Sequence, residues 1–235
     1  MKIKKEPVYA LILLCCLFVL YYSLFYLHGK EYYLVSQAII LLGVILFMLN
    51  FEKRKPTAAE LTIVAVMCAL AVVSRVSFFF FPAVKPIAAV VILTGISLGA
   101  ETGFITGAVS AFVSNFYFGQ GSWTPFQMFA LGLVGFFAGI LFQKIPVNRW
   151  SLGIYAVLSV IVLYGGIVDI NTLFFYGGGN TWEAIRVVYG AGFFMNLVFG
   201  ISTAVFVLLF YKPVLNKLAR LKRKLAVSEY ENKEN

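Results

Sequence analysis

Residues 57–80 read TAAELTIVAVMCALAVVSRVSFFF, and this stretch decides what kind of protein the chain encodes. As an α-helix it would extend for about 36 Å at 1.5 Å per residue, whereas the hydrocarbon core of a bilayer is about 30 Å thick. Its only charged residues are Glu60, near the start, and Arg75, near the end. The stretch therefore predicts a helix that crosses a membrane.

The composition extends this prediction to the whole chain. Of the 235 residues, 61% are hydrophobic and 12% are charged, about half the charged fraction of a soluble domain. Mean hydropathy is +0.91. Long unbroken apolar runs dominate, and the strict alternation of a lipid-facing barrel is missing. We expect an all-α integral membrane protein.

Eight apolar runs are counted as predicted spans, although two of them, 86–100 and 103–117, are short. They are 8–27, 33–51, 57–80, 86–100, 103–117, 126–142, 151–170 and 186–211. The turn between the fourth and fifth runs is expected at Glu101-Thr102. A basic stretch at 52–56 divides the chain, which gives three predicted parts: two additional N-terminal transmembrane helices (1–52), a six-helix core (53–213) and a basic, then polar, cytoplasmic tail (214–235).

The first run also has the basic start of a signal peptide. It is longer than a typical signal-peptide core, and no A-x-A cleavage site follows it. We therefore expect a retained helix.

Lysine and arginine predict the orientation. With the N-terminus in the cytoplasm, 15 of the 19 lysines and arginines fall on the cytoplasmic side. Only Lys30, Arg75, Lys85 and Arg186 fall on the other side. Both termini are thus expected on the cytoplasmic side of the membrane, and the net charge of +9 reflects topology rather than nucleic-acid binding.

Motifs for several kinds of chemistry are missing from the sequence. It contains no GxxxxGK[ST], HExxH or GxSxG pattern. Neither the three cysteines nor His28 fall into a metal-binding spacing. No enzyme activity, metal or bound cofactor is expected.

Arg75 and Lys85 flank the segment 78–81, which reads FFFF. A charge at mid-membrane costs roughly 2.5–3.5 kcal/mol. Both side chains can therefore bind an acceptor-rich ligand at the outer face, or they can extend to lipid headgroups. Position alone does not decide between these alternatives.

Residues 114–128 read SNFYFGQGSWTPFQM. The glycines and Pro125 are typical of a hairpin between helices, with Thr124 as the N-cap of the second helix. A hairpin does not explain why Asn115, Gln120, Trp123 and Gln127 gather there. Neutral amides in a membrane protein need partners, and a large ligand with amides of its own would supply them.

Two further features have a functional and a structural interpretation. The glycines at 177–179 follow Phe174-Phe175-Tyr176 and indicate either a lid over a pocket or a mobile connector. Ala65 and Ala69 are four residues apart, which suits close approach by another helix, either from a partner or within the chain.

From about 57 to 211 the chain resembles the S-components of energy-coupling factor (ECF) transporters, the vitamin importers of prokaryotes. The resemblance lies in six helices, internal termini, outer loops and the alanine pair. Residues 74–86 and 114–128 look like those of the cobalamin-type S-components, which carry an arginine, aromatic residues and a K-P, followed by an S-N-x-x-F-G-Q-G-x-W-T-P-x-Q-M run.

The resemblance implies a mechanism. Such a protein binds its vitamin, here cobalamin or a related corrinoid, at the outer face. It then associates with a membrane coupling subunit and two cytoplasmic ATPases and topples in the bilayer. Ala65 and Ala69 would contact the coupling subunit. The substrate-binding candidates are Arg75, Lys85, Asn115, Gln120, Trp123 and Gln127, with Asp169, Asn171, Tyr176 and Tyr189 added by topology.

Three alternatives remain open at this point. The same fold can bind a different small metabolite. An integral membrane enzyme acting on lipid is a second class, although few acidic or histidine residues are available to it. A structural or signalling partner without a ligand is a third.

Overall fold

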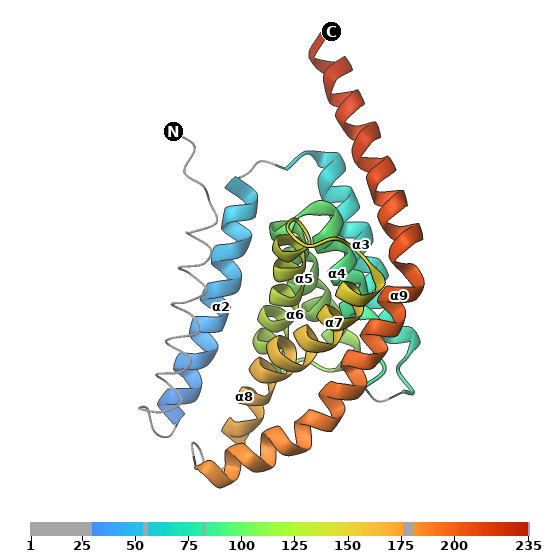
Figure 1. Cartoon of the computed structure of the whole chain (residues 1–235). Coiled ribbons are helices and arrows are strands. Elements are labelled where there is room, and N and C mark those ends of the chain that lie inside the picture. Colours follow the sequence, from blue (N-terminus) through green and yellow to red (C-terminus); the bar gives the residue numbers. More distant parts are fainter. Residues whose placement is uncertain (1–29, 54–55, 82, 176–180, 235) are drawn as a thin grey trace.

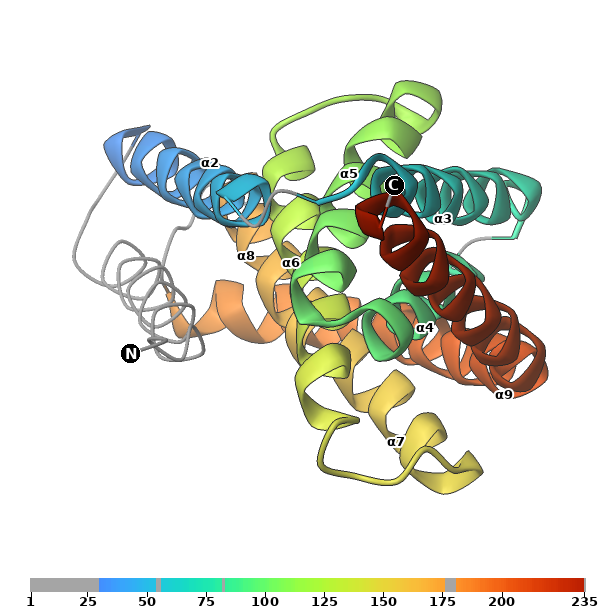
Figure 2. The same cartoon turned by 90° about the horizontal axis from the view of Figure 1, so that it is seen from above.

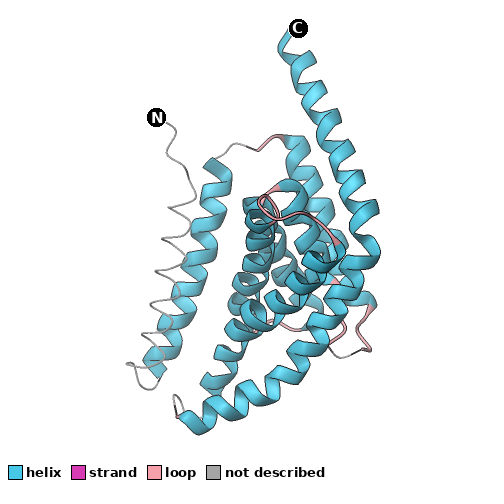
Figure 3. Ribbon diagram, viewed as in Figure 1, coloured by secondary structure: helices cyan, strands magenta, loops and turns pink. Residues whose placement is uncertain are grey.

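The computed structural model describes residues 30–53, 56–81, 83–175 and 181–234, and the described residues contain helices and no strand (Figures 1 and 3). The protein is an all-α integral membrane protein. The predicted span 8–27 lies outside the described residues. The elements are α2 (Lys30–Lys53), α3 (Ala58–Ser77), α4 (Ile87–Leu98), α5 (Ala100–Phe118), α6 (Trp123–Leu141), α7 (Arg149–Ser159), η1 (Val160–Gly165), α8 (Gly166–Phe175) and α9 (Trp182–Glu234).

The helices run up and down between two ends of the molecule (Figure 1). The turns that follow α3 and α5 and the start of α9 lie at the lower end, which is the predicted outer face. The Lys53 end of α2, the α6–α7 turn and the end of α9 lie at the upper end. This arrangement agrees with the predicted orientation.

Four described segments are long and apolar enough to cross a membrane. They are Ala58–Ser77, Trp123–Leu141, Arg149–Leu173 and Trp182–Lys224. The third is interrupted by the π-helix η1 but remains one rod from α7 to α8. Helix α4 has 12 residues, about 18 Å of helix, which is shorter than the hydrocarbon core of about 30 Å, so it does not cross the bilayer as predicted for 86–100. It is apolar on all sides because it is buried among its neighbours.

The turn between α4 and α5 differs from the prediction. We expected it at Glu101-Thr102, but the chain reverses at Gly99 and Glu101 lies in the first turn of α5. Gly99 has a φ of 104°, which L side chains rarely adopt. The position that requires glycine therefore fixes the turn.

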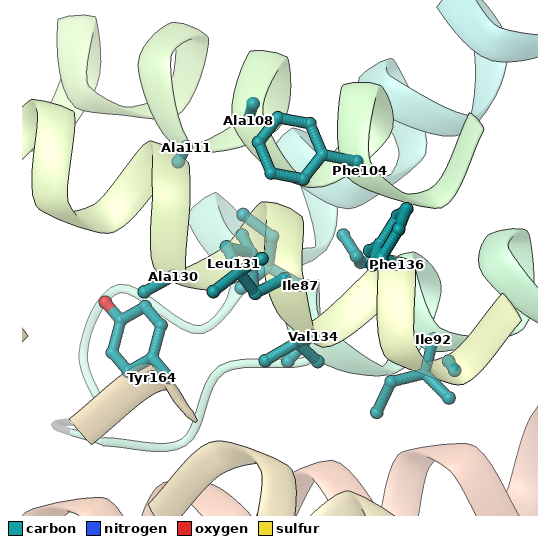
Figure 4. Close-up of a cluster of buried hydrophobic side chains, with 14 of the residues drawn as sticks. Ile87, Ile92, Phe104, Ala108, Ala111, Ala130, Leu131, Val134, Phe136 and Tyr164 are labelled. Atoms are coloured by element: carbon teal, nitrogen blue, oxygen red, sulfur yellow. The ribbon is translucent and has the colours of Figure 1, made fainter. Parts of the chain in front are cut away.

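Glycines let the backbones of α4, α5 and α6 approach one another. A Cβ added to Gly135 would lie 2.3 Å from the carbonyl oxygen of Gly103, and one added to Gly95 would lie 2.1 Å from that of Gly135. Helix α6 lies in the middle of the bundle (Figure 2). Figure 4 shows core side chains of α5 and α6 meeting, with Tyr164 entering from η1.

Helix α2 shares this hydrophobic core. Ile40, Val44 and Phe47 are buried, and the Phe47 ring stacks on Phe104 with 3.9 Å between centroids. The predicted division at 52–56 separates α2 from the later helices along the chain, but α2 packs directly on α5 and α6.

Helix α9 continues beyond the predicted span end at 211. It contains Pro213 and remains helical to Glu234. The residues after Pro213 are mainly Leu, Lys, Arg and Ala, which favour helix. The expected basic tail is thus a helical extension of the last span.

Candidate functional site

Arg75 lies in the last turn of α3 and is only 7% exposed. Its guanidinium donates hydrogen bonds to Ser114 Oγ and, at 3.0 Å, to Asn115 Oδ1. It also stacks over the Phe118 ring, 4.3 Å from the centroid. The side chain therefore points into the protein rather than to lipid headgroups. Its Nε is buried without a hydrogen-bond partner among the described residues.

The amides of 114–128 bond to one another. Asn115 Nδ2 donates to Gln127 Oε1 at 2.9 Å and to Thr124 Oγ1 at 3.2 Å. Thr124 Oγ1 donates to Gln120 Oε1 at 2.9 Å, and Gln120 Nε2 donates to the carbonyl of Phe112 at 3.0 Å. The network joins the end of α5 to the start of α6. Because these amides already have hydrogen-bond partners within the protein, their presence alone no longer indicates a bound ligand.

The start of α6 also differs from the prediction. The helix begins at Trp123 after Ser122, so Thr124 lies in its first turn and is not its N-cap. Thr124 instead accepts a hydrogen bond from the Gly121 N–H at 3.2 Å. Trp123 is 39% exposed, and its ring packs where a side chain on Gly121 would lie. Trp123 is therefore available at the outer surface.

Lys85 lies in the loop between α3 and α4 and is half-buried. Its backbone N–H donates to Ser202 Oγ at 3.4 Å, and its ammonium lies 5.7 Å from the centroid of the Phe199 ring. Burial, and secondly the charge of Arg75, lower the pKa of Lys85 from 10.5 to about 8. The ammonium is therefore still mainly protonated at neutral pH.

A second polar group joins α8 to α9. Asn196 Nδ2 donates to Asp169 Oδ2 at 3.0 Å. Gly192 faces the Asp169 carboxylate and Gly165 faces the Asn196 amide; an added Cβ on either glycine would lie within 2.5 Å of the opposite side chain. Each polar side chain thus occupies space that a glycine on the other helix leaves open.

Of the remaining substrate-binding candidates that were added by topology, one forms a hydrogen bond and one has a side-chain oxygen without a partner. Tyr189 donates to the carbonyl of Gly166 at 2.8 Å. Asn171 is 5% exposed, and its Oδ1 has no hydrogen-bond partner among the described residues. Tyr176 and the glycines 177–179 lie outside the described residues, so the lid and connector interpretations stay open.

Tyr164 was not predicted as a candidate. It is buried on η1, and its ring meets the Phe199 ring of α9 edge-on, with 5.1 Å between the centroids. Asn196 was also missed. Polar residues inside apolar spans are a usual sign of function in membrane proteins, and both residues carry that sign in the sequence.

Ala65 and Ala69 lie on an exposed face of α3. They line a groove of about 550 Å³ together with Val109 and Val113 of α5. A second groove of about 390 Å³ lies between α3, α4 and α9 and is almost wholly apolar. Within the described residues, then, the hydrogen-bonded cluster around Arg75 lies at the outer end, and the grooves along α3 suit apolar contact.

The helices and their polar outer end define a multi-pass membrane protein. Residues 55–216, more than half of the chain, match the family described as ECF-type riboflavin transporter, S component. The chain belongs to this family. No curated protein and no solved structure shows a significant match to the chain.

Membership confirms the S-component part of the resemblance. S components are transport subunits and not enzymes, as expected for this chain. The cobalamin part of the resemblance has no support from the family description, which names riboflavin. Among the described residues no three His, Cys, Asp or Glu side chains are grouped to hold a metal.

Proposed function

We propose that this chain captures a corrinoid such as cobalamin at the outer face and delivers it to the inside of the cell as the S component of an ECF importer. The observation that carries the proposal is the outer polar cluster: Arg75 and its partners Ser114, Asn115 and Phe118, with Lys85 near by. This cluster is built from the two segments, 74–86 and 114–128, that resemble the cobalamin-type members.

The chemistry of the cluster fits a large flat ligand with polar edges. Trp123 offers an exposed aromatic face, and such faces pack well against planar rings. Arg75 Nε is a donor that has no hydrogen-bond partner among the described residues. The amide oxygens of a corrinoid rim are acceptors that complement it.

A flavin is the second candidate substrate. The family description favours it, because the matched model is named for riboflavin transport. Its ring is also planar, with donors and acceptors along one edge. The two candidates differ in size, which makes a direct comparison decisive.

Titration of the purified protein with cobalamin, cobinamide and riboflavin tests the proposal. We expect micromolar or tighter binding of cobalamin or cobinamide. Truncation of Trp123 to Ala should weaken that binding roughly threefold to tenfold, since aromatic contacts contribute about 0.5–1.5 kcal/mol beyond burial. Phe116→Ala is the matched control, because Phe116 is 70% exposed on the preceding helix. Binding of riboflavin without either corrinoid would overturn the corrinoid assignment.

Transport requires partners for this chain, which has no ATPase motif. We infer that a membrane coupling subunit and two cytoplasmic ATPases associate with it, and that the coupling subunit packs on the exposed face of Ala65 and Ala69. Small residues allow such close helix approach in a bilayer. Toppling of the loaded subunit would then expose the outer site to the cytoplasm.

Replacement of Ala65 or Ala69 by leucine should strongly weaken assembly and uptake without changing ligand affinity. Both positions are exposed, so the larger side chain has space within the chain. In a packed interface, overfilling costs about 1–3 kcal/mol, or roughly 5- to 150-fold in association. Co-purification with the coupling subunit measures the loss. Val66→Leu, on an exposed position of the same helix, is the control; a fall in ligand binding instead would place the alanines in internal packing.

A further inference from the structure

Helix α2 lies outside the matched family range, which begins at residue 55. It nevertheless packs on two helices within that range, α5 and α6. Its Phe47 stacks on Phe104 with an interplanar angle of 15°, and meets Phe136 edge-on at 5.2 Å. Ile40 and Val44 are 0% and 1% exposed. These contacts fix α2 against both α5 and α6.

The other side of α2 is exposed and apolar. Leu42 and Leu49 are 57% and 46% exposed, as suits a surface in contact with lipid. One side of α2 therefore packs on α5 and α6, while the groove at Ala65 and Ala69 is lined by α3 and α5. The contacts of α2 leave that groove free for a partner.

At its outer end α2 makes a polar contact with the loop between α5 and α6. Gln37 Nε2 donates a hydrogen bond to the carbonyl oxygen of Ser122. Ser122 directly precedes Trp123, and the loop begins at Gly119, where φ is 99°. An unpartnered amide in an apolar setting costs free energy, so this bond favours one register of α2 against the loop.

We propose that α2 is a brace for the outer loop 119–122 and that Gln37 is the positioning residue through which it holds Gln120 and Trp123 in place for ligand capture. The role of the loop in capture rests on the proposed function; the bracing itself does not. One consequence is that α2 moves together with the six-helix domain during transport.

Hydrogen exchange of the full-length, ligand-free protein in lipid nanodiscs tests the brace. Gln37→Leu keeps an apolar side chain of similar length but removes the donor. We expect amides of 119–124 to exchange about two- to tenfold faster, the effect of losing one hydrogen bond of about 0.5–1.5 kcal/mol. Ala38→Leu, at the exposed neighbouring position, should leave exchange in this loop unchanged.

Two further variants separate positioning from general packing. Gln37→Asn is shorter by one methylene and should loosen the same loop without lowering the melting temperature. Phe47→Ala removes the ring stack and should raise exchange across α5 and α6 as well. Unchanged exchange at 119–124 in both Gln37 variants would overturn the brace.

The same variants then link the brace to capture. With cobalamin or riboflavin, whichever binds, Gln37→Leu should speed ligand dissociation by a factor similar to that seen in exchange. Failure of both compounds to bind would count against the proposed function and leave the exchange result intact. Normal dissociation together with faster loop exchange would overturn the role of Gln37 in capture.

Discussion

Gly135→Ala should strongly destabilise the bundle, although it adds a single methyl group. The added Cβ would lie 2.3 Å from the Gly103 carbonyl oxygen and 2.7 Å from Val91 Cγ1. The first of these is a backbone atom, so relief requires α5 and α6 to move apart. Overpacking of a core costs about 1–3 kcal/mol when side chains can yield, and we expect at least the upper end of that range here.

The measurement is a thermal melt of the purified protein, together with the yield of monodisperse material. Gly166→Ala is the matched control, because Gly166 is also helical and a Cβ there meets nothing within 4 Å. That variant should be as stable as the parent or slightly more so, since alanine favours helix over glycine. A Gly135→Ala protein that melts like the Gly166→Ala protein would contradict the close approach of α5 and α6.

The glycine contacts also affect the outer site. Helix α5 carries Ser114 and Asn115 near its end, and α6 carries Thr124 and Gln127 near its start. Separation of the two helices would lengthen the 2.9 Å bond between Asn115 and Gln127. A Gly135 variant that still folds should therefore also bind ligand less well.

The sequence predicted the helices well because apolar length carries that signal. Of the predicted runs within the described residues, each coincides with a helix or with the α7–η1–α8 rod. The turn at Gly99 was missed because the charge of Glu101 was taken as its marker, whereas the backbone conformation decided it. The packing of α2 was not predicted, because a helix that is apolar all round gives no indication of which side faces protein.

The site was predicted in its residues but not in its bonding. Asn115, Gln120 and Gln127 were identified as amides that need partners, and the structure shows that they satisfy that need through Thr124 and one another. Such pairing depends on how α5 and α6 pack against each other, and the spacing of residues in the sequence does not predict that geometry. The contact of Asp169 with Asn196 joins residues 27 positions apart and depends on glycines on the opposite helices.

Arg75→Met should weaken ligand binding roughly 10- to 150-fold while changing the melting temperature of the ligand-free protein little. Hydrogen bonds from a charged group contribute about 1.5–3 kcal/mol, which sets the expected loss in affinity. Without Arg75, Asn115 Oδ1 loses the hydrogen bond that the guanidinium donates to it, at a cost of about 1–3 kcal/mol. Burial of a charge is itself costly, so its removal offsets this loss and the two effects on stability nearly cancel.

The near-cancellation is what makes this variant informative. Within the described residues Arg75 makes no ion pair; neutral oxygens and the Phe118 ring are its partners. Arg75→Lys keeps the charge but loses the planar guanidinium with its several N–H donors. The affinity of this variant for the ligand should therefore lie between those of the parent and Arg75→Met. Arg186→Met is the matched control, because Arg186 is exposed near the same end of the molecule. A large fall in melting temperature with unchanged affinity would show that Arg75 pins α3 to α5 and takes no part in capture.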